Sequence, residues 1–462
     1  MTDSPTPKSP TSLTRRSFAK SAGAGAAALA FPFVGRWSRA ASPNGKLRHA
    51  CIGCDGQGWA DMNDLASHPN IEIVALCDVD TARQARAAAK FPEARRYQDY
   101  REMLEKEAGN IDSVNIAVPD HMHAPIAMAA IALGKHVYCQ KPLTHTVGEA
   151  RDLRLAAEKA GIVTQMGNQI QSTADYQIGA ELIRTGAVGK VTEIHAWSNA
   201  RFPQRGRKAG SDPVPESLDW DKWLGVAPER PYLAPNEDGG MSRFYHPFHW
   251  RGWIDFGGGP MGDFGCHILD TPFKGTGLKF PTSVRNVELP QEWLDHADWQ
   301  KENWPDWQVV EFEFPGTEVT AETVKVVWYD GGKQPPREVF QYESDDRRPP
   351  GGGSLIVGES GRLLVTHFGV RPQLIPYEAN RGLKMPDLQS FSHYHAFIDA
   401  CLGKGKTGSN FGFAGPMTET VQLGNLASRF PGKKLAWDAD KFTFPGEPDA
   451  DKLLRKEYRK WS

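Results

Sequence analysis

Short apolar runs alternate with helical stretches between Lys46 and Gly167, and this alternation restricts the possible fold more than any other feature. The runs predicted as strands are Arg48–Ile52, Ile71–Cys77, Ser113–Val118, His136–Cys139 and Val163–Met166. Helices are predicted between them, near residues 59–68, 81–90, 99–107, 124–134 and 147–160. This pattern predicts a doubly wound parallel sheet with right-handed crossovers, which binds ligands at the carboxyl ends of its strands.

The first turn of this α/β region carries a degraded G-x-G-x-x-G motif. Gly53 and Gly58 occupy the first and third positions, but Asp55 takes the second, with Gly56 beside it. The middle glycine normally lets the backbone approach a pyrophosphate at the helix N-terminus. A carboxylate there would repel phosphate unless it points away, so the motif alone is a weak signal for a dinucleotide.

Asp78 ends the second predicted strand, about 20 residues after the glycine turn. An acid at this place accepts hydrogen bonds from an adenosine ribose. No arginine follows it immediately, which favours NAD over NADP. The alternative is that Asp78 caps the following helix.

The third and fourth strand ends carry further candidates for a cofactor site. Pro119 and His123 follow the third strand, and Gln140 and Lys141 end the fourth. A lysine before proline is held in extended backbone and is predicted to point into the crevice, where it could help a hydroxyl lose its proton. The sequence leaves two roles open for His123: a contact with the cofactor, or a helix cap or buried polar group.

After Gly167 the pattern changes to runs of strands, which predicts an α+β domain with an open, predominantly antiparallel sheet over residues 168–440. Its predicted strands are Val191–Trp197 and residues 284–289, 308–314, 318–329 and 354–366. The preceding residues 46–167 form the predicted nucleotide-binding Rossmann domain. Residues 441–462 are predicted to be a tail that packs on the body.

Asp263, His267 and Asp270 are spaced i, i+4 and i+7, so they are predicted to share one face of a helix. Such a row can be a proton-transfer pair, a helix-stabilising acid beside a satisfied histidine, or half of a metal site. No further His or Cys partner accompanies it, so we predict no metal. Trp250 and Trp253, shortly before this row, are the preferred candidates for contact with a sugar face, although core packing would explain most of the tryptophans.

The N-terminus resembles an export signal. Arg15 and Arg16 precede the apolar run Ser21–Val34, which is too short to span a membrane as a helix. We predict a twin-arginine signal peptide over residues 1–41, passage through that export machinery, a periplasmic or otherwise exported location, and no stable membrane insertion. The alternative is a disordered basic leader. Because this pathway carries folded chains, the six cysteines need no disulfides. Cys51 and Cys54 are predicted to be buried structural residues, and the alternative is a redox pair.

The chain resembles the glucose–fructose oxidoreductase / inositol dehydrogenase / rhizopine-catabolism (Gfo/Idh/MocA) family over essentially all of residues 46–462. Gln140-Lys141-Pro142 corresponds to the family's E-K-P motif, and Asp263 and His267 to its D-x-x-x-H motif. The closing stretch Tyr458–Trp461 resembles an exported branch. The resemblance implies a Rossmann domain beside an open-faced sheet domain that commonly forms homodimers or homotetramers. It also implies hydride exchange between a nicotinamide and a sugar or polyol carbon.

The resemblance also implies roles for individual residues. Lys141 would orient the reacting hydroxyl, His267 would be the general acid/base, and Asp263 would bind substrate and tune the histidine. The expected cofactor-binding residues are Gly53, Gly56, Gly58, Asp78, Pro119, His123, Gln140 and Lys141. The expected substrate-binding residues are Asn168, Gln169, Trp250, Arg251, Trp253 and Asp270. Gln140 and Asp55 depart from the family pattern.

Three functions are compatible with these residues. The first is an NAD-dependent dehydrogenase of a sugar, glycoside or polyol, with a tightly bound cofactor. The second is a redox-neutral enzyme that oxidises a glycoside transiently, cleaves it and reduces the product. The third is a carbohydrate-binding protein without catalysis. A net charge of −2 does not indicate a protein that binds nucleic acid. Export favours a cofactor that is recycled without leaving the protein.

Overall fold

The computed structural model describes residues 45–235, 244–344, 346–367 and 370–461, all within the compact unit Phe33–Ser462. The predicted signal peptide, residues 1–41, lies outside the described residues. In the described ranges, no helix is both long enough and apolar enough to cross a membrane.

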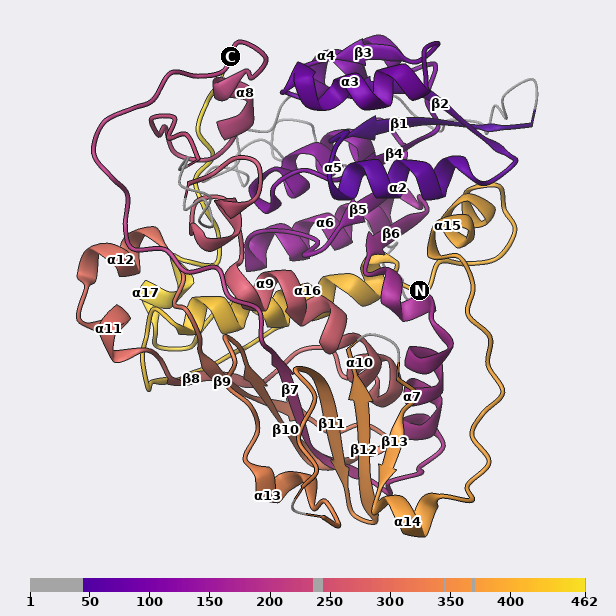
Figure 1. Ribbon diagram of the computed structural model, residues 1–462, viewed down its shortest axis with the longest axis vertical. Coiled ribbons are helices and arrows are strands. Elements are labelled where there is room, and N and C mark those ends of the chain that lie inside the picture. The colour runs from indigo at the N-terminus through magenta and orange to yellow at the C-terminus, as the bar shows by residue number, and fades with distance from the viewer. Residues whose placement is uncertain (1–44, 236–243, 345, 368–369, 462) are drawn as a thin grey trace, which may run out of the picture. The chain divides into compact units, whose positions relative to one another are not determined.

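Within the described residues, the first sheet has six parallel strands in the order β3-β2-β1-β4-β5-β6 (Figure 1). The strands are β1 (Leu47–Ile52), β2 (Ile71–Cys77), β3 (Arg95–Tyr97), β4 (Ser113–Ile116), β5 (His136–Gln140) and β6 (Thr164–Gly167). The strand order reverses between β1 and β4, which opens a crevice at their carboxyl ends. The predicted doubly wound sheet is confirmed. The sequence pattern missed β3 because its three residues are exposed or half-buried and include no apolar run.

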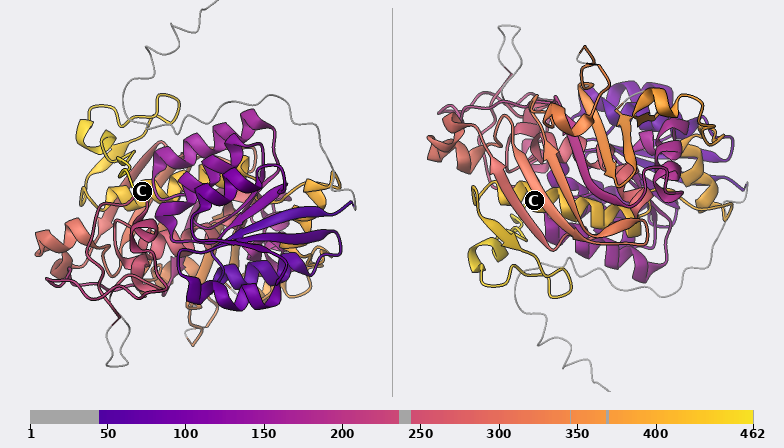
Figure 2. Two further views of the ribbon diagram at one scale, coloured as in Figure 1. Left: turned by 90° about the horizontal axis from the view of Figure 1, so that it is seen from above. Right: turned by 90° about the horizontal axis from the view of Figure 1, so that it is seen from below.

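Helices connect these strands and cover both faces of the sheet (Figure 2). They are α2 (Gln57–Ala66), α3 (Thr81–Lys90), α4 (Tyr100–Glu107), α5 (His123–Ala132) and α6 (Val147–Ala160). Asp80 begins α3 by accepting from the Ala82 N–H, and Thr146 and Glu149 form a reciprocal cap at α6. Because Asp80 is the cap, the alternative prediction that Asp78 caps this helix is wrong.

The second sheet has, among the described residues, eight strands in the order β13-β12-β11-β7-β10-β9-β8-β14. These strands are β7 (Val191–Ser198), β8 (Ser283–Glu288), β9 (Val309–Pro315), β10 (Thr320–Tyr329), β11 (Gly352–Gly358), β12 (Gly361–Thr366), β13 (Gln373–Ile375) and β14 (Lys434–Ala436). Strands β7 and β10 pair in parallel and the other neighbours pair antiparallel. The predicted open, predominantly antiparallel sheet is confirmed. Residues 354–366, predicted as one stretch, are instead the hairpin of β11 and β12.

The remaining helices lie around this second sheet and in the connections. They are η1 (Asp120–Met122), η2 (Gln169–Ser172), α7 (Ala174–Arg184), α8 (Trp220–Leu224), η3 (His249–Gly252), α9 (Gly259–Ile268), α10 (Asp270–Thr276), α11 (Gln291–Leu294), α12 (Ala297–Glu302), α13 (Arg337–Phe340), α14 (Tyr377–Asn380), α15 (His393–Cys401), α16 (Phe411–Ala427) and α17 (Pro448–Asp451).

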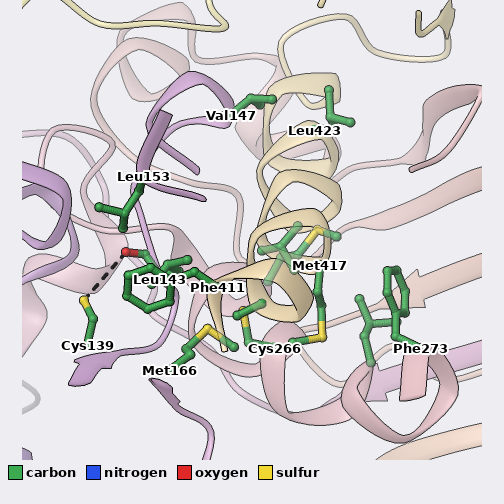
Figure 3. Close-up of a cluster of buried hydrophobic side chains, with 14 of the residues drawn as sticks. Cys139, Leu143, Val147, Leu153, Met166, Cys266, Phe273, Phe411, Met417 and Leu423 are labelled. Carbon is green, nitrogen blue, oxygen red and sulfur yellow. Dashed lines mark hydrogen bonds between the residues drawn. The ribbon is translucent and has the colours of Figure 1, made fainter. Parts of the chain in front are cut away.

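Helix α16 crosses between the two sheets and joins their cores (Figure 1). One continuous cluster of buried apolar side chains contains Met417 and Leu423 of α16 and Leu153 of α6 (Figure 3). The buried Glu419 carboxylate of α16 accepts from the Arg151 guanidinium of α6 at 2.8 and 2.7 Å. Apolar burial and a bidentate ion pair therefore fix the two domains against each other.

Helix α15 returns to the first domain, where Phe397 and Ile398 share a buried cluster with Leu65 of α2. All six cysteines lie in the described ranges, each is buried, and none forms a disulfide. The prediction that Cys51 and Cys54 are buried is confirmed.

Candidate functional site

The turn after β1 approaches its neighbours so closely that two of its residues must be glycine. A Cβ on Gly53 would lie 2.2 Å from the carbonyl oxygen of Ala117, and a Cβ on Gly58 would lie 2.2 Å from that of Gly53. Gly56, with a φ of 53°, immediately precedes α2, and a Cβ there would meet open space. The start of α2 therefore has room for a phosphate bound by helix N–H groups, which fits a dinucleotide.

Asp55, which replaces the middle glycine, forms an ion pair. Its carboxylate lies 2.5 Å from the Arg83 guanidinium of α3. The same guanidinium donates to His246 Nε2 at 3.0 Å and lies 3.6 Å from the Asp80 carboxylate. The negative charge beside the glycine turn is therefore offset, which reduces the repulsion that Asp55 would exert on a phosphate.

The Asp78 carboxylate joins the end of β2 to the glycine turn. It accepts from the Cys54 N–H at 2.8 Å and from the Asp80 N–H at 3.0 Å. Burial raises the pKa of Asp78 to about 6. At neutral pH the group is mostly ionised and is an acceptor for a ribose hydroxyl.

A cavity of about 520 Å³ extends from this turn across the carboxyl ends of the strands. The predicted site residues in its lining are Gly53, Gly56, Asp78, Pro119, His123, Gln140, Lys141, Trp250, Arg251 and Asp263. The predicted site residues outside this lining are Gly58, Asn168, Gln169, Trp253, His267 and Asp270. One cavity thus brings together the glycine turn, the ends of β2, β4 and β5, and the start of α9.

Other residues of the lining were not predicted from the sequence. They include Arg83, Asp120, Lys222, Trp223, His246, Phe248 and Trp461. Most come from the irregular segment around α8 and η3, where aromatic side chains form their own buried cluster. The abundance of tryptophan in that region could have indicated a ligand-binding wall, but core packing explained it equally well.

Lys141, Asp263 and Arg251 form a charged group at the end of the cavity away from Asp78. Lys141 Nζ donates to the Asp263 carboxylate at 2.7 Å and to its carbonyl at 2.9 Å. Arg251 Nε donates to the same carboxylate at 3.3 Å. Burial alone would raise the pKa of Asp263, but the charges of Lys141 and Arg251 hold it well below its ordinary value. Asp263 is therefore an anion that orients two cations.

His267 follows Asp263 by one helical turn on α9. Burial, and then the charges of Lys141 and His367, hold the pKa of His267 well below its ordinary value. Its ring lies 5.5 Å from that of His367. Its Nδ1 is buried and has no hydrogen-bond partner among the described residues. The imidazole is therefore neutral near pH 7 and can take up a proton.

Gln140, which replaces the family's glutamate, has an acidic partner on another element. Its amide donates to the Asp61 carboxylate of α2 at 2.7 Å, and both side chains are buried. Asp61 also accepts from Gln57 at 2.7 Å and from Tyr394 at 2.8 Å. Burial raises the pKa of Asp61 to about 6. The carboxylate beside this strand end therefore comes from α2 and not from residue 140.

Asp270 begins α10, just past the end of α9, and lies in a buried polar cluster. Its carboxylate accepts from Asn168 and from Gln171, each at 2.6 Å. Burial raises the pKa of Asp270 to about 7. Gln169 donates to Tyr394 at 3.0 Å. The structure thus places Asp270 and Asn168 against each other and outside the lining of the cavity.

The two predicted sugar-binding indoles are both buried, and only one of them lines the cavity. Trp250 lines the cavity, and its ring lies 4.3 Å from the Arg251 guanidinium. Trp253 is fully buried, with its ring 5.6 Å from that of Tyr245. Both indoles belong to the same aromatic cluster, and Trp250 is the one that can meet a ligand.

His123 and Asp120 fix the backbone around the strand ends. His123 lies between the carbonyls of Pro142 and Val118, at 2.8 Å from each, and burial lowers its pKa to about 4. Asp120 accepts from the Gly258 N–H at 2.9 Å. Burial, and then the charge of Asp263, raise the pKa of Asp120 to about 7. His123 thus joins the ends of β4 and β5, and Asp120 joins β4 to the start of α9.

Two domain models of one family match the chain. Residues 47–168 match the model described as the NAD-binding Rossmann fold of the GFO_IDH_MocA oxidoreductase family. Residues 185–304 match the C-terminal alpha/beta domain of the same family. Together the matches cover just over half of the chain.

Individual relatives are sugar enzymes by name. The D-apiose dehydrogenase of Paraburkholderia graminis is 33% identical over 228 residues, which are 49% of this chain and 48% of that protein. The dTDP-3,4-didehydro-2,6-dideoxy-alpha-D-glucose 3-reductase of Streptomyces antibioticus is 32% identical over 155 residues, 33% of this chain and 46% of that protein. The chain thus spans about half the length of these two relatives.

Solved structures share the fold over most of the chain. The WlbA dehydrogenase from Bordetella pertussis, crystallised with NADH and UDP-GlcNAcA, has a TM-score of 0.59 and 17% identity, covering 86% of this chain and all of that one. An inositol dehydrogenase homologue from Azotobacter vinelandii, crystallised with NADH and myo-inositol, has a TM-score of 0.54 and 16% identity, covering 85% of this chain and 98% of that one. Both matched domains and their arrangement lead to one assignment. The chain belongs to the Gfo/Idh/MocA oxidoreductase family.

Proposed function

We propose that this protein is an oxidoreductase that exchanges hydride between a tightly bound nicotinamide cofactor and a hydroxyl carbon of a sugar, glycoside or polyol. One observation carries the proposal. The Lys141–Asp263 pair, with His267 one turn further along α9, lies at the end of a cavity that begins at a tight glycine turn. The bound nicotinamide supplies the hydride acceptor or donor.

The residues at this end of the cavity can handle the proton of the reacting hydroxyl. Lys141, held by Asp263, donates a hydrogen bond to the hydroxyl oxygen and stabilises the negative charge that develops there. His267, which lies one helical turn from Asp263 but outside the lining of the cavity, is the proposed proton acceptor. Trp250 offers an aromatic face to the sugar.

We propose NAD as the cofactor in preference to NADP. Asp78 lies where an adenosine ribose would bind, and an ionised carboxylate there would repel a 2′-phosphate. Arg83, the guanidinium in the same part of the cavity, already faces Asp55 and Asp80.

A redox-neutral cycle is the second candidate, in which a glycoside is oxidised, cleaved and reduced again on one cofactor. Trp461 lies in the wall of the cavity, where it would slow release of the cofactor. Slow release favours a cycle in which the cofactor stays in place. The third candidate, a binding protein without catalysis, rested mainly on Asp55. The ion pair of Asp55 with Arg83 removes that support.

We further propose export through the twin-arginine pathway, with residues 1–41 as the signal, and assembly into a homodimer or homotetramer. The paired Arg15 and Arg16 before an apolar run support export. The family resemblance supports assembly. Cell fractionation and light scattering of the purified protein test these two points separately.

The test of the main proposal is to purify the mature protein, dialyse it and measure bound nicotinamide by absorbance and mass spectrometry. We expect NAD to remain bound and a panel of sugars and glycosides to be turned over. Net production of NADH identifies a dehydrogenase, and cleavage of a glycoside without NADH identifies the redox-neutral cycle. Sugar affinity without any NAD or NADP binding would refute both enzymatic proposals.

A further inference from the structure

The end of the chain forms part of the cavity wall. Trp461 lines the cavity together with Gln98 and Tyr100, near Asp78. The Trp461 indole is half-buried, with the Arg101 guanidinium 3.8 Å from its centre and the Tyr100 ring 6.1 Å away. The indole is therefore held at the edge of the cavity by defined contacts.

Arg459 attaches the chain end to the α8 region. Its guanidinium donates to the Asp221 carboxylate at 2.6 Å and to the Asp221 carbonyl at 2.9 Å. It also donates to the carbonyls of Gly225 and Ala227, each at 3.1 Å. Its backbone N–H donates to the Val226 carbonyl at 3.1 Å. Arg459 thus bonds to α8 and to the residues that follow it, through both its side chain and its backbone.

A second attachment lies at the start of α6. The Tyr458 hydroxyl donates to the Glu149 carboxylate at 2.8 Å. Lys456 Nζ lies 2.9 Å from His145 Nδ1 and 3.2 Å from Glu149. Figure 1 shows the chain ending beside α8. Residues 456–461 therefore form a strap that runs from α6 to α8 and is bonded at both places.

We propose that this strap retains the dinucleotide and that the Trp461 indole forms one wall of the adenine site. The inference rests on the cofactor binding proposed above. Asp78 marks the place of the adenosine ribose, so the adenine must occupy the part of the cavity next to it. Tyr100, Met122 and Ile126 line the cavity together with Trp461 and provide apolar surface for a purine ring.

The strap would also slow dissociation of the cofactor. A cofactor that leaves the cavity past Trp461 must first displace the indole, and the bonds of Arg459 and Tyr458 oppose that displacement. An enzyme that recycles its cofactor without releasing it would gain from such a strap, because dissociation would be slow compared with turnover.

The test compares NADH with reduced nicotinamide mononucleotide, which lacks the adenosine, in the mature protein and in Trp461→Ala. We expect the variant to release NADH at least about 5-fold faster, because stacking on an aromatic side chain contributes at least about that factor to the binding of a base. We expect unchanged affinity for the mononucleotide, since it does not reach Trp461. Arg459→Ala, which frees the strap, should shift NADH release in the same direction.

Trp299→Ala is the matched control, because Trp299 is also a half-buried indole beside an arginine but lies outside the cavity. If the Trp461→Ala variant does not fold, Trp461→Phe should give a smaller acceleration of the same kind. Equal NADH release rates in these variants and in the parent protein would refute the proposed role of the strap in retaining the dinucleotide, and would leave the proposed function intact. A parent protein that binds neither nucleotide would overturn the proposed function itself. Weakened binding of both nucleotides would show a general structural effect and would also overturn the adenine site.

Discussion

Replacing Gln140 with glutamate, the residue that the family motif carries, is expected to destabilise this protein. The Gln140 amide donates to one oxygen of Asp61 at 2.7 Å, while Gln57 and Tyr394 donate to the other. Both Gln140 and Asp61 are almost completely buried. A glutamate would place a second carboxylate against the first, with no donor between them.

The magnitude follows from two costs. Losing a buried hydrogen bond to a charged group costs about 1.5–3 kcal/mol, and forcing the two carboxyls to share a proton adds about 1.4 kcal/mol for each unit by which one pKa rises. For a rise of one pKa unit, we therefore expect Gln140→Glu to lower the free energy of unfolding by about 3–4 kcal/mol at pH 7. Burial already raises the pKa of Asp61 to about 6. A raised carboxyl pKa means that stability is lost as pH rises through it, so the deficit should be smaller at pH 5.

Urea unfolding at pH 5 and pH 7, followed by tryptophan fluorescence, measures this effect. In Asp61→Asn/Gln140→Glu the carboxylate and the amide exchange places, so one donor again faces one acceptor. We expect this double variant to recover at least half of the loss. Full stability of the single variant at pH 7, or no recovery in the double variant, would refute the assigned contact.

Further predictions concern the glycine turn, the proposed base His267 and the ion pair between α6 and α16. Gly58→Ala would place a Cβ 2.2 Å from the Gly53 carbonyl oxygen, so NADH affinity measured by fluorescence titration should fall by about 10-fold or more. His267→Ala should lower kcat by about 100- to 10,000-fold without changing NADH affinity, and a near-normal rate would exclude His267 as the base. Because burial and Lys141 lower the pKa of His267, the rate of oxidation should fall only as pH drops well below 6.5, and a midpoint at or above that value would contradict this. Glu419→Gln removes the buried anion that the partly buried Arg151 binds and should cost about 3–5 kcal/mol in urea unfolding, whereas an unchanged midpoint would show that the pair contributes nothing.

Periodicity predicted those parts of the fold that obey a local rule. The strands of the first sheet have apolar runs, and β3, which has none, was missed. The spacing of Asp263 and His267 placed both correctly on one helix, because four residues make about one turn. Extending the same rule to Asp270 was wrong, because α9 ends at Ile268 and Asp270 begins the next helix, α10. The amides that Asp270 meets come from the segment after β6.

The cavity wall could be predicted only in part, because much of it depends on distant contacts. Trp461 reaches the site through bonds of Arg459 to a loop more than 200 residues earlier, and no local pattern encodes that contact. Trp250 and Trp253 are both buried members of one aromatic cluster, and only Trp250 also lines the cavity. Their spacing in the sequence does not reveal this difference, because the shape of the cavity depends on contacts between distant segments.

The two departures from the family motifs have the same physical explanation, and it bears on function. Asp55 adds a negative charge at the glycine turn, and Arg83 on α3 supplies the matching positive charge. Gln140 removes a negative charge at the strand end, and Asp61 on α2 supplies a carboxylate that accepts from the Gln140 amide. Neither departure therefore leaves an unpaired charge beside the cavity. This removes the electrostatic objection to cofactor binding that the two departures raised.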